Sequence, residues 1–130
     1  MAIRSFNELL DEARRQPEPQ RLLFVFARAE LPDEPSAEQR RRFEQGEGGV
    51  LTPALCVDKR PDELTDMAAL ADEARETGME WDVAFVAALA DPEGTADVEP
   101  HLERMVEALK MGNVERFLAF DTQGEVLSLG

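Results

Sequence analysis

The stretch RLLFVFARAE, residues 21–30, decides the expected fold. It is a short apolar run with two phenylalanines and a valine, a pattern typical of a strand covered on both faces. WDVAFVAALAD, residues 81–91, has the same character and is also bounded by charged residues. We therefore expect two neighbouring buried strands at the centre of the protein.

Helical patterns surround these two strands. Capping boxes that begin at Ser5 and Ser36 predict one helix before the first strand and one after it. Residues 61–78 and 98–112 predict two further helices, because each stretch places its apolar residues on one helical face. The helix after Ser36 has little apolar face, so we expect it to be exposed and loosely packed.

Two weaker patterns complete the expected sheet. After the glycine-rich loop GEGG, residues 46–49, a strand is expected over about Ala54–Val57. Pro53 cannot donate a ladder hydrogen bond, so it indicates a sheet edge, a bulge or a late strand start. VERFLAFD and EVLSL, residues 114–121 and 125–129, predict a closing hairpin with Gly124 at a position that needs positive φ.

Strands and helices thus alternate along a chain of 130 residues, the usual size of one domain. Such alternation favours parallel strands joined by crossover helices. The prediction is a single α/β domain over residues 1–130. We expect a mainly parallel sheet of about four to five strands, with flanking helices and a C-terminal β-hairpin.

The acidic net charge of the chain limits the classes of molecule that it is expected to bind. The chain has 28 acidic and 14 basic residues, a net charge of −14, and such a surface repels phosphate backbones and anionic lipid headgroups. Nucleic acids and membranes are therefore poor partners, whereas a protein partner or a cation remains compatible. The beginning of the chain lacks the apolar core of a signal peptide, so we expect a cytoplasmic protein.

Acidic residues end each predicted strand. They are Glu30, Asp58, Asp91 and Asp121. If the carboxyl ends of the strands meet at one rim, these carboxylates could hold a hard cation such as Mg²⁺. The simpler interpretation is that aspartate forms turns and caps helices, and that many strand ends are acidic in so acidic a chain. No other cofactor is evident from the sequence.

Cys56 is the only cysteine, so it cannot form an internal disulfide. With a single histidine, His101, a zinc site of the usual Cys/His type is also excluded. Asp58 and Lys59 follow closely, and a nearby ammonium group could lower the pKa of the Cys56 thiol and make it reactive. The alternative is an inert thiol that packs like a small buried hydrophobic residue.

Arg40, Arg41 and Arg42 form a basic cluster in an acidic chain. They could bind an acidic partner segment or a second copy of the chain, which would give a homodimer, or they could simply be a solvated helix face. GEGG lacks the Lys-Ser/Thr of a phosphate-binding loop and precedes a strand rather than following one, so a helix end and flexible connection is the simpler interpretation.

Four stretches of the chain together resemble a family of small uncharacterised proteobacterial proteins: QPEPQRLLFVFA (16–27), GEGG with CVDK (46–49 and 56–59), WDVAFVAAL (81–89) and FDTQG (120–124). The resemblance runs nearly end to end and implies no established activity. Some members are automatically labelled ribonucleotide reductase alpha subunit. That enzyme is a far larger barrel whose radical chemistry needs several cysteines, so none of its catalytic residues is carried over.

Two hypotheses of function follow. The first is a non-catalytic protein-interaction or regulatory module that uses the arginine-rich helix for protein contacts. The second is a small enzyme or ligand-binding domain at the strand-end rim, with Asp58 and Asp91 as metal or acid/base groups and Cys56 as a thiol nucleophile.

Overall fold

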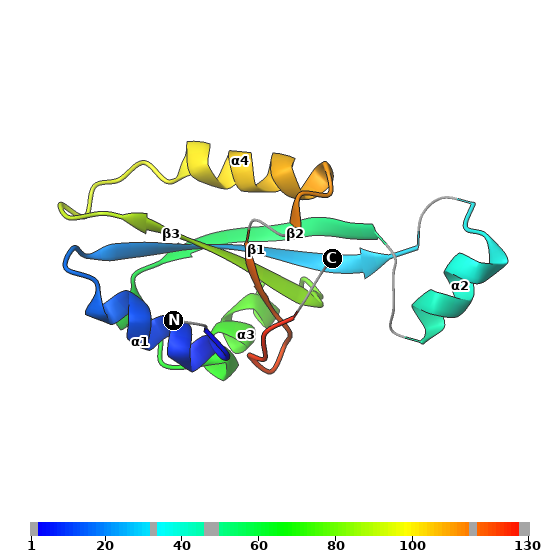
Figure 1. The fold of residues 1–130 in the computed structure, drawn as a ribbon, viewed down its shortest axis with the longest axis horizontal. Coiled ribbons are helices and arrows are strands. Elements are labelled where there is room, and N and C mark those ends of the chain that lie inside the picture. Colours follow the sequence, from blue (N-terminus) through cyan, green and yellow to red (C-terminus); the bar gives the residue numbers. More distant parts are fainter. Residues whose placement is uncertain (1–2, 32–33, 46–49, 115–116, 128–130) are drawn as a thin grey trace.

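A computed structural model of the protein describes residues 3–31, 34–45, 50–114 and 117–127. The described residues form four strands, four α-helices and one 3-10 helix (Figure 1). In chain order these are α1 (Phe6–Arg15), β1 (Gln20–Glu30), α2 (Ala37–Glu44), β2 (Val50–Lys59), η1 (Pro61–Glu63), α3 (Met67–Arg75), β3 (Val83–Ala90), α4 (Glu99–Lys110) and β4 (Leu118–Phe120).

The four strands form one antiparallel sheet in the order β2-β1-β3-β4, so the predicted mainly parallel sheet is wrong. The helix α2 accounts for the antiparallel pairing of β1 with β2, whereas α4 packs on the sheet and β4 still runs antiparallel to β3. The helix α2 lies between β1 and β2 in the chain but buries none of its residues. Because α2 does not pack on the sheet as a crossover helix would, β2 turns back beside β1. The strand β3 then runs parallel to β2, but with β1 between them.

The sheet separates two apolar cores. Phe24 and Phe26 of β1 face α1 and α3, whereas Leu23 and Val25 face α4 (Figure 1). Trp81 closes the first core, with its ring in edge contact with Phe26 at a centroid distance of 4.8 Å. The expectation that residues 21–30 form a central strand covered on both faces is confirmed.

The strand β2 lies at the edge of the sheet and is longer than expected. Its pairing with β1 shifts register between Phe26 and Ala27, and Pro53 lies opposite Ala27 directly after this irregularity. An edge position suits Pro53, because proline has no N–H group to donate to a further strand.

The predicted helix over residues 61–78 is divided in the structure. Pro61–Glu63 is a 3-10 helix, and α3 begins only at Met67. The Asp66 side chain accepts a hydrogen bond from the Ala69 N–H at 2.9 Å and so caps the new helix start.

The turn after β4 has the positive backbone angle that the sequence predicts, since φ of Gly124 is 85°. The Phe6 N–H donates to the Gly124 carbonyl at 3.0 Å. A Cβ atom at this glycine would lie 3.0 Å from the Met67 Cβ, so the turn packs closely against α1 and α3. Residues 115–116, part of the expected strand 114–121, lie outside the described residues, as do residues 46–49 of GEGG.

The antiparallel register makes a prediction about the single cysteine. Val25 lies opposite Cys56 in the β1–β2 pairing. Mild oxidation of a Val25→Cys variant should therefore give an intrachain disulfide, because directly opposed strand residues bring their Cβ atoms within bridging distance. Mass spectrometry of the digested chain measures the product. Ala29→Cys, whose partner is Leu51, is the matched control, and an equal yield from both variants would contradict this register.

Candidate functional site

The strand directions divide the four predicted rim carboxylates into two pairs. Because β2 and β3 run parallel to each other, Asp58 and Asp91 lie at the same end of the sheet. Glu30 lies at the other end, where β1 finishes, and Asp121 lies there too because β4 runs antiparallel to β3. A shared rim of four carboxylates is therefore not formed.

Arg21 joins Asp58 to Asp91. It lies at the start of β1, directly after Gln20, and its guanidinium group reaches both carboxylates. Nη1 donates to Asp58 Oδ2 at 2.8 Å, while Nη2 and Nε donate to Asp91 Oδ2 at 2.8 and 3.1 Å. The Gly94 carbonyl accepts a further hydrogen bond from Nη2 at 3.3 Å. The guanidinium group occupies the position between the two acids that a cation would need.

The ion pair between Arg21 and Asp91 is largely buried, as is typical of an ion pair that stabilises a fold. The Arg21 and Asp91 side chains are only 14% and 4% exposed. Hydrogen bonding to Arg21 lowers the pKa of Asp91, and the same contact raises the pKa of Arg21. Asp91 also accepts from the Ala96 N–H at 3.0 Å, so it fixes the loop between β3 and α4. Among the residues that the structure describes, no group of three or more His, Cys, Asp or Glu side chains is arranged to hold a metal ion.

The lowered pKa of Asp91 makes stability depend on pH. Its ion pair stabilises the fold above the ordinary aspartate pKa of about 3.9, and this contribution is lost as the pH falls through the lower folded-state value. Asp91→Asn should therefore lower the free energy of unfolding at pH 7, and its difference from wild type should shrink below about pH 4. Urea unfolding across pH measures this. The control Asp72→Asn, at a side chain 69% exposed, should change stability by under about 0.5 kcal/mol. A pH-independent difference for Asp91→Asn would contradict the assignment.

Cys56 lies in a groove of about 560 Å³ between β2 and α4. Its side chain is exposed, so it is not the small buried residue of the second alternative. Partial burial nevertheless raises the pKa of the Cys56 thiol. The Lys59 ammonium, which could have lowered that pKa, pairs instead with Glu73 of α3 on the opposite face of the sheet. The geometry therefore does not activate the thiol.

We expect the Cys56 thiol to be accessible to reagents in the folded protein but to react slowly. A chromogenic disulfide should label Cys56 in the folded protein, because the side chain is exposed. The labelling rate should reach half its maximum at a higher pH in the folded chain than in urea, because only the thiolate reacts and burial raises the thiol pKa. A lower midpoint in the folded chain would reverse the conclusion and identify a nucleophile.

The groove that contains Cys56 has an acidic wall and an apolar floor. The floor is a stripe at i, i+4, i+8 spacing formed by Val98, Leu102 and Val106. The wall is the adjacent stripe of Glu99, Glu103 and Glu107, whose side chains are exposed. Sequence reasoning missed this surface. Two parallel stripes in one predicted helix were a signal, but the facing strand could not be identified without the fold.

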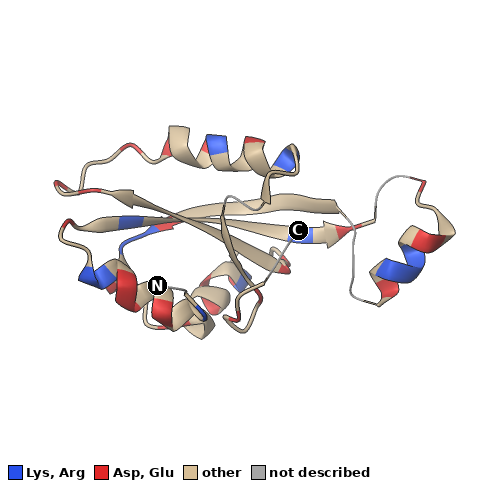
Figure 2. Cartoon of the chain, viewed as in Figure 1, with Lys and Arg blue, Asp and Glu red and all other residues tan. Residues whose placement is uncertain are grey.

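The arginine-rich helix α2 stands apart from the body of the protein (Figures 1 and 2). Arg40, Arg41 and Arg42 are all exposed. None of them forms an ion pair within residues 3–31, 34–45, 50–114 and 117–127, the part that the structure describes. The predicted exposed and loosely packed helix is confirmed, and it ends at Glu44.

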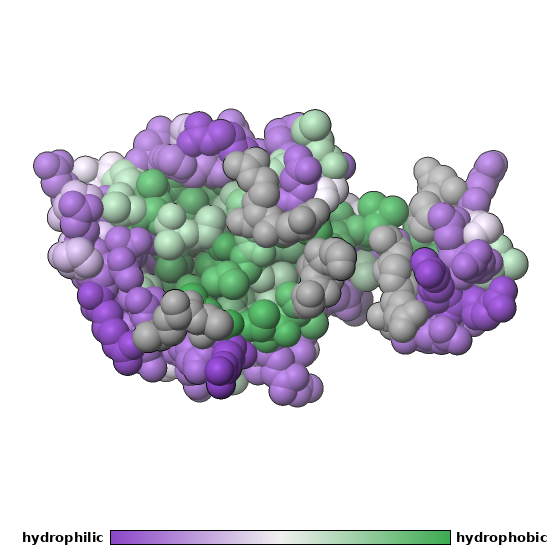
Figure 3. Space-filling view, viewed as in Figure 1, coloured by the Kyte–Doolittle hydropathy of each residue, from purple (hydrophilic) through white to green (hydrophobic). Residues whose placement is uncertain are grey.

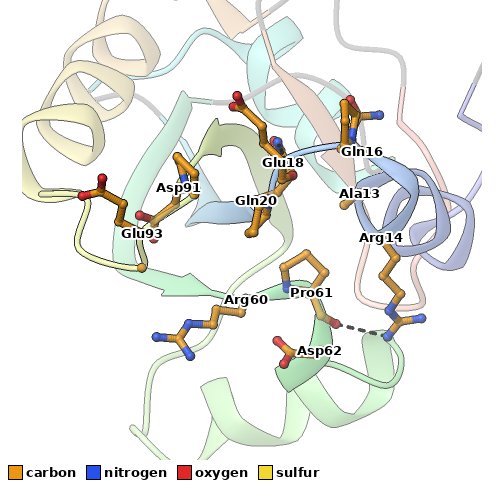
Figure 4. A pocket seen from close by; sticks show the side chains of 14 residues that line it. Ala13, Arg14, Gln16, Glu18, Gln20, Arg60, Pro61, Asp62, Asp91 and Glu93 are labelled. Atoms are coloured by element: carbon orange, nitrogen blue, oxygen red, sulfur yellow. Dashed lines mark hydrogen bonds between the residues drawn. The ribbon is translucent and has the colours of Figure 1, made fainter.

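A second cleft of about 560 Å³ lies where α1, η1, the start of β1 and the end of β3 meet (Figure 4). Arg14 is turned toward η1 and donates to the Pro61 and Leu64 carbonyls at 3.1 and 2.7 Å. Arg60 points away from Pro61 (Figure 4). Because these cationic side chains do not converge, the cleft has no evident centre for a ligand.

Comparison with protein-family models, with curated proteins and with solved structures found no match to this chain. In the described part of the chain, every helix is too short or too polar to cross a membrane.

Proposed function

We propose that the protein is a non-catalytic protein-interaction module and that its contacts are made by the arm, residues 34–45, which contains α2. The observation that carries this proposal is the exposure of α2: eight residues, an arginine cluster and no buried side chain. Isolated helices shorter than about 12 residues are marginal in water, so a helix of this length gains most of its stability from packing. The arm lacks that packing within its own described chain, and a partner would supply it.

The surface properties of the arm support the same proposal. Figure 3 shows the arm as a hydrophilic surface set apart from the apolar area between α4 and the layer of α1 and α3. The capping box at Ser36 is formed, with Gln39 N–H donating to Ser36 Oγ at 3.1 Å. The helix is therefore locally pre-organised, which lowers the entropy lost when it binds.

Charge reversal on the arm tests the proposal. Tagged wild type and an Arg40→Glu/Arg41→Glu/Arg42→Glu variant are used to capture proteins, including untagged copies of the chain, from an extract of the producing cells. A protein enriched by wild type should be lost with the variant, because its acidic contacts meet like charge. Quantitative mass spectrometry measures the loss, and titration calorimetry with the purified protein confirms direct binding.

The matched control is Arg4→Glu/Arg15→Glu/Arg75→Glu, which makes the same change in net charge at exposed positions outside the arm. Wild type and control should capture the same protein. Identical capture by all three chains would exclude the arm as the binding surface.

The alternative function is a small enzyme or ligand-binding domain that uses Asp58, Asp91 and Cys56. It is favoured by the exposure of Cys56 beside Asp58 in a groove. Two observations weigh against it: Arg21 binds both carboxylates, and the pKa of the thiol is raised. A rise in melting temperature with Mg²⁺ that Asp58→Asn removes would support it over the interaction module.

A further inference from the structure

We propose that the chain forms a two-fold dimer in which α2 of each copy lies in the groove between α4 and β2 of the other. This inference rests on the proposed function, since it names the partner of the same arm. Its basis is that one chain carries two complementary surfaces, each left open in the described structure.

The charges of the two surfaces are complementary. All four charged residues among the described lining of the groove are acidic: Asp58, Glu99, Glu103 and Glu107. Asp58 already pairs with Arg21, but the three glutamates form no ion pair within the described residues. Guanidinium groups bind carboxylates through paired hydrogen bonds, so the arginines of α2 match a row of glutamates.

The apolar parts also match. Phe43 is the only aromatic residue of α2, and it remains partly exposed. It shares a helix face with Arg40 because the two are three positions apart. When Phe43 lies on the floor formed by Val98, Leu102 and Val106, Arg40 faces the glutamate wall. Eight residues of α2 span about 12 Å, the same as the floor from Val98 to Val106.

The arrangement of the chain favours binding of the arm to the groove of a second copy over binding to the groove of the same chain. The arm leaves the sheet where β1 ends and β2 begins, and it points away from the body (Figure 1). The groove begins near Asp58 and Val98, at the opposite end of β2. A two-fold axis lets both arms exchange at once and forms the same contact twice.

Net charge restricts how two copies can meet. Each chain has a net charge of −14, so most pairs of surfaces repel one another. A contact that places Arg40, Arg41 and Arg42 against glutamates brings opposite charges together at the interface. The arm and the groove are therefore a favourable pair for self-association.

Paired charge reversals test this dimer by sedimentation equilibrium. Wild type should dimerise, and Arg40→Glu/Arg41→Glu/Arg42→Glu should weaken the dimer at least tenfold, as should Glu99→Arg/Glu103→Arg/Glu107→Arg. An equimolar mixture of the two variants should restore dimers, because both contacts then join opposite charges. The control Arg4→Glu/Arg15→Glu/Arg75→Glu should dimerise like wild type. The proposal would be overturned if both charge-reversal variants still dimerised. It would also be overturned if their mixture formed no dimers although circular dichroism showed both variants to be folded.

A second measurement needs no substitution. A maleimide–diazirine cross-linker on Cys56 should, on illumination, join the groove of one copy to residues 40–43 of another. Mixing ¹⁵N-labelled with unlabelled protein shows by mass spectrometry that the link is between chains. Cross-links only within the chain, or to other surfaces, would contradict the arrangement.

The outcomes separate this inference from the proposed function. A wild-type chain that stays monomeric, yet captures another protein through the arm, would overturn the dimer and leave the interaction module standing. A monomeric chain with no arm-dependent capture would overturn both.

Discussion

The whole architecture depends on β1 being buried on both faces and paired on both edges. Its residues 22–27 are all buried, and α1, α3 and α4 pack against its two sides. Burial of large side chains such as Phe24 and Phe26 supplies the main driving force for folding. Because β2 and β3 both pair with this strand, every other element of the body is positioned relative to it.

Near its start the same strand carries a charged residue that fixes one end of the sheet. Arg21 lies between the ends of β2 and β3, and its buried pairing with Asp91 ties three strands and the loop before α4 together. A buried charge without its partner is costly, so the arrangement specifies which strands end together. The acidic residues that resembled a metal or catalytic site in the sequence therefore have a structural role at this position.

The other end of β1 has the opposite character. There the chain leaves the sheet and forms α2, a helix with no buried residue (Figure 1). The two ends of β1 therefore differ in how their charged residues are paired. At the Arg21 end both carboxylates are ion-paired, whereas the arginines of α2 and the glutamates of the α4–β2 groove form no ion pair within the described residues.

The sequence by itself determined the local elements. The apolar runs identified β1 and β3, the capping boxes at Ser5 and Ser36 identified two helices, and the turn chemistry placed Gly124 at positive φ. These features depend on residues close together in the chain, so short-range patterns are sufficient. The weak apolar face of α2 also predicted its exposure correctly.

Only the tertiary structure decided strand direction, and with it the grouping of charged residues. A helix between two strands favours a parallel crossover, but α2 does not pack on the sheet, and α4 packs there although β4 runs antiparallel to β3. The resulting antiparallel order placed Glu30 and Asp121 at the end of the sheet opposite to Asp58 and Asp91. It brought Arg21 between Asp58 and Asp91. It also set Cys56 opposite the glutamates of α4. Such meetings join residues distant in sequence, and local patterns carry no information about them.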